Sequence, residues 1–472
     1  MHRFYMIVWS LGLLFILPLV SCKKFVDISP PQTSVVTASV FNNDANATAA
    51  LTGIYSKIES SSDLVDFSLE NGLLADELTN YSSYSLQVEY YTNSMLSKDI
   101  ANPWYDAYNY IYQANAVISG LQASNGVSLA AKQQLTGEAE FLRAFWHFYL
   151  TNCYGAVPLV TTTDYTVNAT AVRIPVGQVY RQIITDLTNA QNSLSSHYVD
   201  ATDSLTTTER VRPTKWAAAA LLARVYLYNG TYDSAEQQST LVINGSGGLY
   251  SLCNSLDSVF LMNNTEAIWQ LPPVQPSSNL ATPEGEDFIL TTSPVVSGSF
   301  NSATISPQLL NSFETGDLRE VHWIGSYTGG SVSYLFPFKY KVYQTSSLVE
   351  YTVILRLAEQ YLIRAEARAQ QGNTSGAIAD LNVIRNRAGL PAYAGGTDQA
   401  SLLTAVLHER QVELFAEFGH RWFDLKRTGA IDSVLSAVTP LKGGSWSTDW
   451  ELFPVPLIEL ASDTKLVQNP GY

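Results

Sequence analysis

Apolar residues recur every three to four positions along much of this chain, which is the period of an α-helix with one buried face. The longest such run covers residues 129–154, where Leu135, Leu142 and Phe145 lie on one stripe. The other runs with this period cover residues 45–58, 103–118, 175–194, 214–229, 232–243, 351–371, 377–389 and 399–418. The pattern predicts a mainly α-helical protein.

Short breaks between some of these runs favour helical hairpins. Asn229-Gly230 separates one predicted helix from the next, and Gly372-Asn373 does the same for a later pair. Glycine readily ends a helix, and a small residue such as Ala235 lets two paired helices approach closely. This arrangement is typical of tetratricopeptide units. We therefore expect four tetratricopeptide-like helix pairs that stack as an α-α superhelix.

The segment 244–350 has a different character, because it is rich in Ser, Thr, Gly and Pro. Its short apolar runs predict loops with short strands over residues 264–298 and 323–343. A loop-rich segment of this length inside a compact body is usually functional. The same interpretation applies less strongly to residues 79–98 and 161–173.

The amino terminus has the features of a secretory signal. Residues 1–21 contain Arg3 and then an apolar run that is too short to span a bilayer comfortably. The run ends at Cys22, in a setting that resembles a bacterial lipobox, so we expect Cys22 to carry a lipid. An ordinary cleaved signal with an incidental cysteine is the alternative. Residues 22–40 would then be a tether, and residues 41–472 a single domain with the 244–350 segment as its insertion.

Charge and cysteine content exclude several classes of protein. The 472 residues carry 27 Lys and Arg against 42 Asp and Glu, a net charge of −15, which argues against general binding of nucleic acid. Three cysteines cannot build a disulfide scaffold or a four-cysteine zinc site. The sequence does not decide whether Cys153 and Cys253 pair. Tyrosines outnumber phenylalanines by 27 to 18, which suits polar ligands at a wet surface.

The sequence contains no recognisable catalytic or cofactor-binding motif, so we expect no enzyme, no cofactor and no metal site. Glu413 and Glu417 are four residues apart on one helix, a poor arrangement for a glycosidase, whose two carboxyls flank the sugar bond. We interpret them as part of a structural ion-pair cluster that ties the last helix to the following loop. The neighbours expected to neutralise them are Arg410, His420, Arg421, Lys426 and Arg427.

Seven short stretches, in order along the chain, resemble the SusD/RagB family of outer-membrane lipoproteins. The most distinctive is 409–427, which contains the run Gly419-His420-Arg421-Trp422-Phe423-Asp424. The other stretches are 137–144 (GEAEFLRA), 154–159 (YGAVPL), 213–235, 307–319, 453–456 (FPVP) and 468–472 (QNPGY). The resemblance covers the chain from end to end.

This resemblance implies a single α-helical body with an irregular loop face and a place at the outer membrane, anchored by lipid. It also implies a partner, a SusC-like TonB-dependent transporter over which the lipoprotein sits as a lid. Oligosaccharides are the commonest ligands in such families and peptides are a known alternative. Two other hypotheses remain open: a repeat scaffold without a small ligand, and a lipid-anchored glycosidase.

Sugar binding requires exposed aromatic rings flanked by amide and hydroxyl groups. Two predicted loops have this composition, one near residue 80 and one near residue 325. We predict that Asn80, Tyr81, Tyr84, Trp323 and Tyr327 bind the ligand. By contrast Trp104, Trp216 and Trp422 lie on helical stripes or in the family motif, and His147 lies in an aromatic helix, so we assign these four to the structure.

Overall fold

The computed structural model describes residues 40–61, 63–100, 102–203, 205–274, 278–294 and 301–472. The predicted signal peptide, the predicted lipidation site Cys22 and nearly all of the predicted tether lie outside the described residues.

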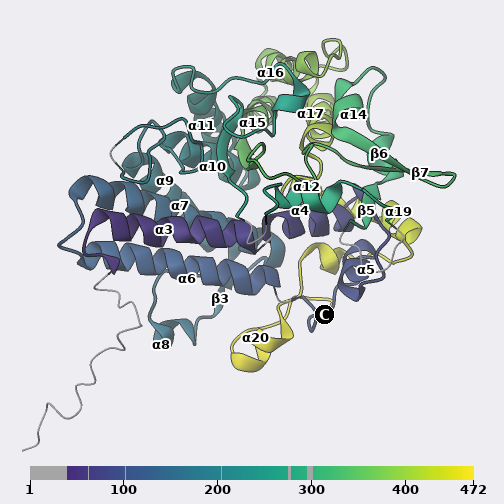
Figure 1. Ribbon diagram of the computed structural model, residues 1–472. Coiled ribbons are helices and arrows are strands. Elements are labelled where there is room, and N and C mark those ends of the chain that lie inside the picture. Colours follow the sequence, from purple (N-terminus) through teal and green to yellow (C-terminus); the bar gives the residue numbers. More distant parts are fainter. Residues whose placement is uncertain (1–39, 62, 101, 204, 275–277, 295–300) are drawn as a thin grey trace, which may run out of the picture.

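Long helices form most of the described body, as the apolar period predicts (Figure 1). They are α3 (Asp44–Ser60), α6 (Asn102–Ala123), α7 (Leu129–Tyr154), α9 (Val176–Ser193), α10 (Lys215–Tyr228), α11 (Tyr232–Gly245), α15 (Leu357–Gln370), α16 (Thr374–Arg387) and α17 (Gln399–Leu414). Consecutive helices pack on one another from α6 through α7, α9 and α10 to α11. Helix α11 then packs on α15, which contacts α16 and α17. The mainly helical class is confirmed, and this stacking is consistent with tetratricopeptide-like pairs.

Helix α7 begins and ends at signals that are visible in the sequence. The Ser128 hydroxyl accepts a hydrogen bond from the Ala131 N–H, which caps the first turn. Gly155 has a φ of 72° and stops the helix at Tyr154. These local determinants explain why the predicted boundaries of this helix match the structure.

One predicted helix is wrong over its first residues. The run 351–371 begins as strand β8 (Thr352–Arg356), and α15 starts only at Leu357. Strand β8 pairs antiparallel with β4 (Ala267–Leu271), and both strands are buried at every position. A fully buried strand shows no alternation, so its apolar run cannot be distinguished from a buried helix by period alone.

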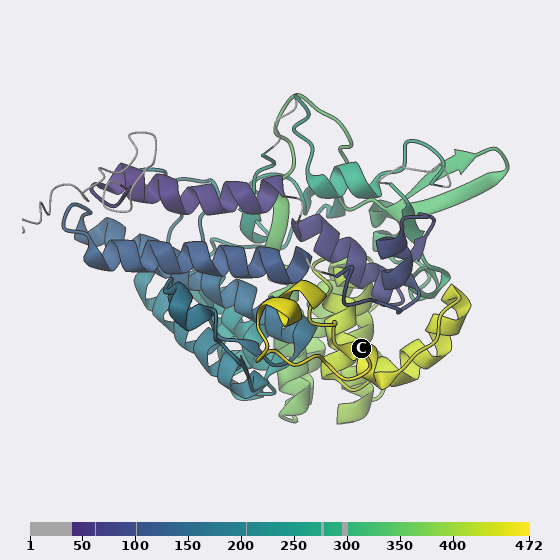
Figure 2. The same ribbon diagram turned by 90° about the horizontal axis from the view of Figure 1, so that it is seen from below.

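The central segment contains the predicted short strands, together with short helices that were not predicted. Strand β1 (Leu78–Asn80) pairs with β5 (Ala303–Ile305), while β6 (Ile324–Gly329) and β7 (Val332–Pro337) form a hairpin. The short helices are α12 (Pro283–Phe288), α13 (Pro307–Leu310) and α14 (Leu318–Trp323). Figure 2 shows this segment along one edge of the molecule, with the C-terminal helices α16 and α17 on the other side.

Smaller elements complete the described chain. Residues 79–98, expected as a loop, contain helix α5 (Ser85–Tyr91), and residues 161–173 contain the single turn α8 (Tyr165–Asn168). The remaining elements are α4 (Asp63–Leu74), β2 (Val157–Pro158), β3 (Arg173–Ile174), α18 (His420–Arg427), α19 (Ile431–Val438) and α20 (Leu457–Ser462). None of the helices in the described ranges is long and apolar enough to cross a bilayer.

The four residues assigned to the structure are all buried. Trp104, Trp216 and Trp422 are all buried, as predicted, and His147 is fully enclosed. Burial and the nearby Arg143 lower the pKa of His147 to about 3, so its ring is neutral. Cys153 and Cys253 are both buried and free, which settles that they do not pair.

A buried ion-pair network surrounds Glu413 and Glu417, which confirms the structural interpretation but corrects its partners. Glu413 pairs with Arg319, Arg356 and Arg387, while Glu417 pairs with Arg356 and with Lys339 at 2.5 Å. Burial alone would raise the pKa of Glu413, but the three guanidinium groups outweigh it and hold that pKa far below its usual range. The network therefore joins α17 to β8, α14 and α16.

The local cations expected to neutralise these two glutamates have other partners. Arg410 and Arg427 both bind Asp424, and Arg421 binds Asp76. Lys426 donates to the carbonyl of Asn152, and burial lowers the pKa of His420 well below its usual value. Proximity in the sequence did not identify the partners, because helices, a strand and a loop from distant parts of the chain supply the positive charges.

Candidate ligand-binding face

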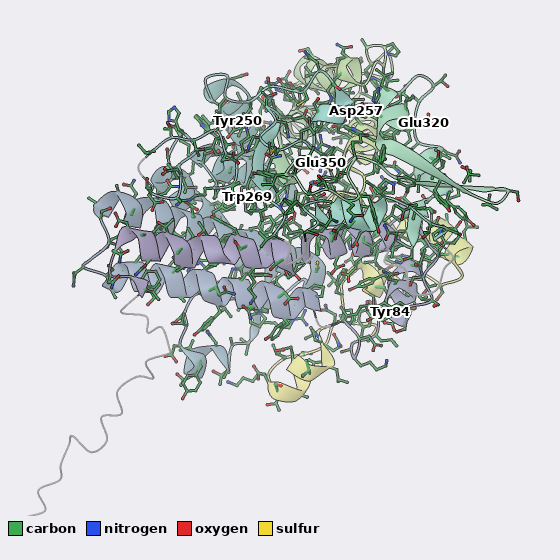
Figure 3. The ribbon with its side chains drawn as sticks, in the orientation of Figure 1. Tyr84, Tyr250, Asp257, Trp269, Glu320 and Glu350 are labelled. Carbon is green, nitrogen blue, oxygen red and sulfur yellow. The ribbon has the colours of Figure 1, made fainter. Side chains whose placement is uncertain are left out.

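Three tyrosine rings gather where the loop after β1 meets the β6–β7 hairpin, and a fourth lies at the rim. The Tyr81 and Tyr334 ring centroids are 5.5 Å apart, in an edge-to-face arrangement with an 86° angle between the planes. Tyr334 is the cross-strand partner of Tyr327. Tyr84 is 63% exposed at the start of α5, on the outer edge of the molecule (Figure 3). We call Tyr81, Tyr84, Tyr327 and Tyr334 the aromatic face.

Backbone pairing places Tyr81 beside the hairpin. Thr79 on β1 lies opposite Thr304 on β5, and the Tyr81 N–H extends this pairing by donating to the Ser302 carbonyl at 2.8 Å. Strand β5 in turn packs against β7. Two segments that are far apart in the sequence therefore present their rings to the same region of the surface.

The hairpin owes its shape to two glycines. Gly330 has a φ of 65° in the turn, a conformation that glycine adopts without strain. Gly325 faces Phe336 across the strands, and a Cβ at Gly325 would come within 2.4 Å of the Phe336 ring. Phe336 can therefore pack inward against Ile289 and Leu290. This packing anchors the strand that carries Tyr334.

The structure brings together most of the residues predicted to bind a ligand. Tyr81 is 38% exposed, and Tyr327 is partly exposed on the hairpin. Asn80 is adjacent, but its amide is engaged locally: it accepts from the Ser82 N–H at 2.9 Å and donates to the Ser82 carbonyl at 3.0 Å. Asn80 therefore shapes the loop that carries Tyr81. Direct contacts of Asn80 and the three tyrosines with a ligand remain predictions.

The prediction for Trp323 is wrong, because its ring is fully buried. Its indole N–H donates to the Leu256 carbonyl at 3.0 Å, and the Lys339 ammonium lies 4.8 Å from the ring centroid. Phe260 packs edge-to-face against it. Trp323 ends helix α14 just before the hairpin and faces the ion-pair network, so it supports the base of the hairpin from inside.

Tyr334 was missed by the sequence reasoning, although a signal for it was present. Gly330-Ser331 separates two short runs and is a recognised two-residue hairpin signal, and a turn at this pair places Tyr327 and Tyr334 opposite each other. The contact between Tyr334 and Tyr81 had no such signal, because it depends on the pairing of β1 with β5.

A polar pocket of about 330 Å³ continues from the same loops. It is lined by Asn279, Glu286, Asp287, Asn301, Tyr343 and Gln344. Asn301 is the residue before Ser302, whose carbonyl holds Tyr81. Amide and carboxyl groups of this kind are suited to hydrogen-bond the hydroxyls of a polar ligand.

No group of three or more His, Cys, Asp or Glu side chains is arranged to hold a metal ion, as far as the described residues go. The aromatic face consists of rings and hydroxyls, and the polar pocket adds amides. Such groups bind polar ligands by stacking and hydrogen bonding.

The stacked helices and their loop-rich edge define the class of this protein, a helical-repeat body that carries an irregular surface. Two family models match the chain. One is described as starch-binding, associating with the outer membrane, and matches residues 24–227. The other is the SusD family and matches residues 305–472. The two matches together span most of the chain, and the chain belongs to the SusD/RagB family.

Individual relatives match along almost the whole chain. SusD-like protein P25 of Formosa agariphila is 23% identical over 96% of this chain and 97% of its own. A solved structure described as a laminarin-binding SusD-like protein is 26% identical, with a TM-score of 0.74 over 92% of this chain and 100% of its own. A SusD superfamily protein from Bacteroides vulgatus is 20% identical, with a TM-score of 0.78 over 91% of this chain and 99% of its own, and so supports the fold alone.

Proposed function

We propose that this protein binds an oligosaccharide on the aromatic face without changing it chemically. The observation that carries the proposal is the edge-to-face contact between Tyr81 and Tyr334, which joins the loop after β1 to the β6–β7 hairpin. Rings held in this way lose little conformational freedom when a sugar stacks on them. The family description as starch-binding and the laminarin-binding relative support a glycan as the ligand class.

The tyrosines of the aromatic face differ in exposure, and we assign them different roles in binding. Tyr84, the most exposed of the predicted tyrosines, offers a ring for stacking at the rim. Tyr81 and Tyr327 are less exposed, and we assign them to hydrogen bonding through their hydroxyls. Each ring contributes a modest binding energy, so two or three rings give a weak binder. Weak binding suffices when a tether and a partner raise the effective concentration of the ligand.

We further propose that the protein is a lipoprotein of the outer membrane that passes its ligand to a SusC-like TonB-dependent transporter. The lipobox-like setting of Cys22 supports the anchor. The description of the first family model, which names the outer membrane, supports the location. Delivery to a transporter rests on family membership and is tested by co-purification from native membranes.

Calorimetry with a panel of glycans, including laminarin and starch oligosaccharides, tests the binding proposal. Tyr84→Ala and Tyr334→Ala should each weaken binding at least tenfold. The control is Tyr165→Ala, because Tyr165 is 79% exposed and its helix, α8, lies far from the hairpin (Figure 1). Absence of heat with every glycan would overturn the proposal and direct the search to peptides. Release of shorter sugars would instead identify a glycosidase.

A further inference from the structure

The segments that build the aromatic face and most of the polar pocket contain no positively charged residue. Residues 58–97, which include β1 and the loop with Tyr81 and Tyr84, hold seven Asp and Glu but no Lys, Arg or His. Residues 225–318, which include α12 and β5, hold nine Asp and Glu and again no Lys, Arg or His. The β6–β7 hairpin has no charged residue at all. The charge that these segments bring to the ligand-binding face is therefore negative.

Two of these carboxyl groups lie beside the aromatic face. Glu286 and Asp287 of α12 line the polar pocket. Ile289 and Leu290, which follow α12 directly, belong to a hydrophobic cluster on which both hairpin tyrosines pack. A ligand that extends from the rings into the pocket therefore meets both carboxyl groups.

Asp287 is the unpartnered member of this pair. The Glu286 carboxyl accepts a hydrogen bond from the Asn279 amide. In the described part of the chain, Asp287 has neither a hydrogen bond nor an ion pair. Burial and repulsion from Asp66, Glu284 and Glu286 raise its pKa to about 7, and no cation among the described residues offsets this effect. A further negative charge brought into the pocket would meet this carboxylate without compensation.

The positive side chains that flank the hairpin in the sequence are already engaged. Lys339 is buried, and its ammonium group pairs with Glu417 at 2.5 Å. The Lys341 ammonium group lies 3.1 Å from the Asp257 carboxyl group, and the His322 ring lies 2.9 Å from it. An anionic ligand could pair with one of these groups only if an existing contact were broken.

The cations that contact the chain just before β1 are engaged as well. The Lys442 ammonium group lies 5.4 Å from the Tyr91 ring centroid, but it is buried and donates to three backbone carbonyls at the end of α4. Arg421 pairs with Asp76 at 2.7 Å. These two cations are therefore held by the protein itself.

We infer that the aromatic face and the polar pocket select an uncharged glycan over one that carries carboxylate or sulfate groups, and that Asp287 determines this specificity. The inference rests on the proposed function, because it names the class of glycan that the same site accepts. Sugar hydroxyls can donate to the carboxylates, whereas an anionic group would lose its hydration and find no free cation. Unpaired like charges are a common means of excluding a competing ligand.

Calorimetry on the full chain at pH 8, with three probes of one backbone, tests this inference. The probes are laminarin oligosaccharides, the same oligosaccharides oxidised at C6 to glucuronate, and the methyl ester of the oxidised form. At about 50 mM salt the uronate should bind at least tenfold more weakly than the uncharged oligosaccharide. The methyl ester should bind within about threefold of the uncharged oligosaccharide, because it has the bulk of the uronate without the charge.

The outcomes separate this inference from the proposed function. Equal affinities for the uronate and the uncharged oligosaccharide would overturn the inference alone, and so would a methyl ester as weak as the uronate. Raising the salt to about 500 mM should narrow the difference several-fold, because ions screen the repulsion, and a difference unchanged by salt would contradict the inference. Starch oligosaccharides and their oxidised and esterified forms are the second series. Absence of heat from every uncharged probe would overturn the proposed function, and the inference with it.

Two substitutions test whether charge at this site sets the preference. Asp287→Asn keeps the shape and an acceptor oxygen, so the ratio of the uncharged to the uronate affinity should fall at least threefold. Ser83→Lys adds a positive charge at an exposed position next to Tyr84 and should strengthen uronate binding several-fold. A ratio that is unchanged in both variants would overturn the inference.

Two controls change the charge by the same amount elsewhere. Asp233→Asn removes a carboxylate at an exposed position of α11. Asn125→Lys adds an ammonium group at an exposed position in the turn that joins α6 to α7, at the opposite end of the molecule from the hairpin (Figure 1). Neither should change the ratio by more than about twofold, because salt screens distant charges. A control that changes the ratio as much as Asp287→Asn would overturn the assignment to this face.

Discussion

Glu59 of α3 and Glu284 of α12 share the hydroxyl of Thr352 on β8. The Thr352 Oγ1 atom lies 2.9 Å from Glu59 Oε1 and 2.8 Å from Glu284 Oε2. A hydroxyl has one proton and can donate it to only one carboxylate. The second contact requires a protonated carboxyl group that donates to Oγ1. The pair therefore retains a proton, and this proton links the helical body to the loop-rich segment.

The shared proton predicts that stability falls as the pH rises through neutrality. Burial and repulsion from Glu284 raise the pKa of Glu59 well above its usual value, and burial raises that of Glu284 to about 7. The folded state therefore binds more protons than the unfolded chain between about pH 4.5 and 7. The stabilisation is present below the unfolded pKa and is lost as the pH rises through the folded one. Melting temperatures measured from pH 5 to pH 9 should show this decline.

Glu284→Gln isolates the contribution of this pair from that of other raised carboxyls. A glutamine keeps the shape and can donate to Oγ1 without a titrating proton. The melting temperature of the variant should depend less on pH than that of the parent protein. A variant with the same slope as the parent would show that the pair does not titrate in this range.

The buried ion-pair network predicts a large loss of stability when one cation is removed. Arg356 contacts Glu266, Glu413 and Glu417, all of them buried. Arg356→Met should lower the free energy of unfolding by about 3–5 kcal/mol, because carboxylates are left without their partner. Urea unfolding measures the difference. Arg181→Met, at an exposed position of α9, should change it by less than about 0.5 kcal/mol.

Trp323 and Tyr84 should respond to truncation in opposite ways. Trp323→Ala should lower the free energy of unfolding by about 3–5 kcal/mol, because it leaves a cavity in the core. Tyr84→Ala should change stability by no more than about 0.5 kcal/mol and should weaken glycan binding. Urea unfolding and calorimetry on both variants make the comparison. A stable Trp323→Ala protein would contradict the structural role given to this ring.

The amino-terminal prediction is tested by changing the proposed lipidation site. Cys22→Ala should move the protein from the membrane fraction to the soluble fraction, because a stable anchor requires the attached lipid. Cell fractionation and immunoblotting measure the distribution. Cys253→Ala, which removes a buried free thiol, should leave the protein with the membranes. A Cys22→Ala protein that stays with the membranes would contradict an anchor at Cys22, and a parent protein that is already soluble would favour an ordinary cleaved signal.

Most of the long helices could be predicted because their determinants are local. The apolar period, the Ser128 cap and the stop at Gly155 all act within a few residues of α7. The same holds for the break at Asn229-Gly230, where Gly230 has a φ of 72°. The exposure of an aromatic ring, by contrast, depends on residues from distant parts of the chain. Trp323 and Tyr84 have similar polar neighbours in the sequence, but only Trp323 is enclosed by Leu256, Phe260 and Lys339.

The sequence by itself determined the helical class, the family and the presence of tyrosine-rich loops, because period, caps and short motifs are properties of neighbouring residues. Only the tertiary structure decided that β1 pairs with β5, which brings Tyr81 to Tyr334. It also decided which arginines neutralise Glu413 and that Asp287 and Tyr343 line one pocket. The physical reason is the same in each case. Strand pairing, charge neutralisation and cavity formation join segments that are far apart along the chain, and the pattern of neighbouring residues carries no information about such contacts.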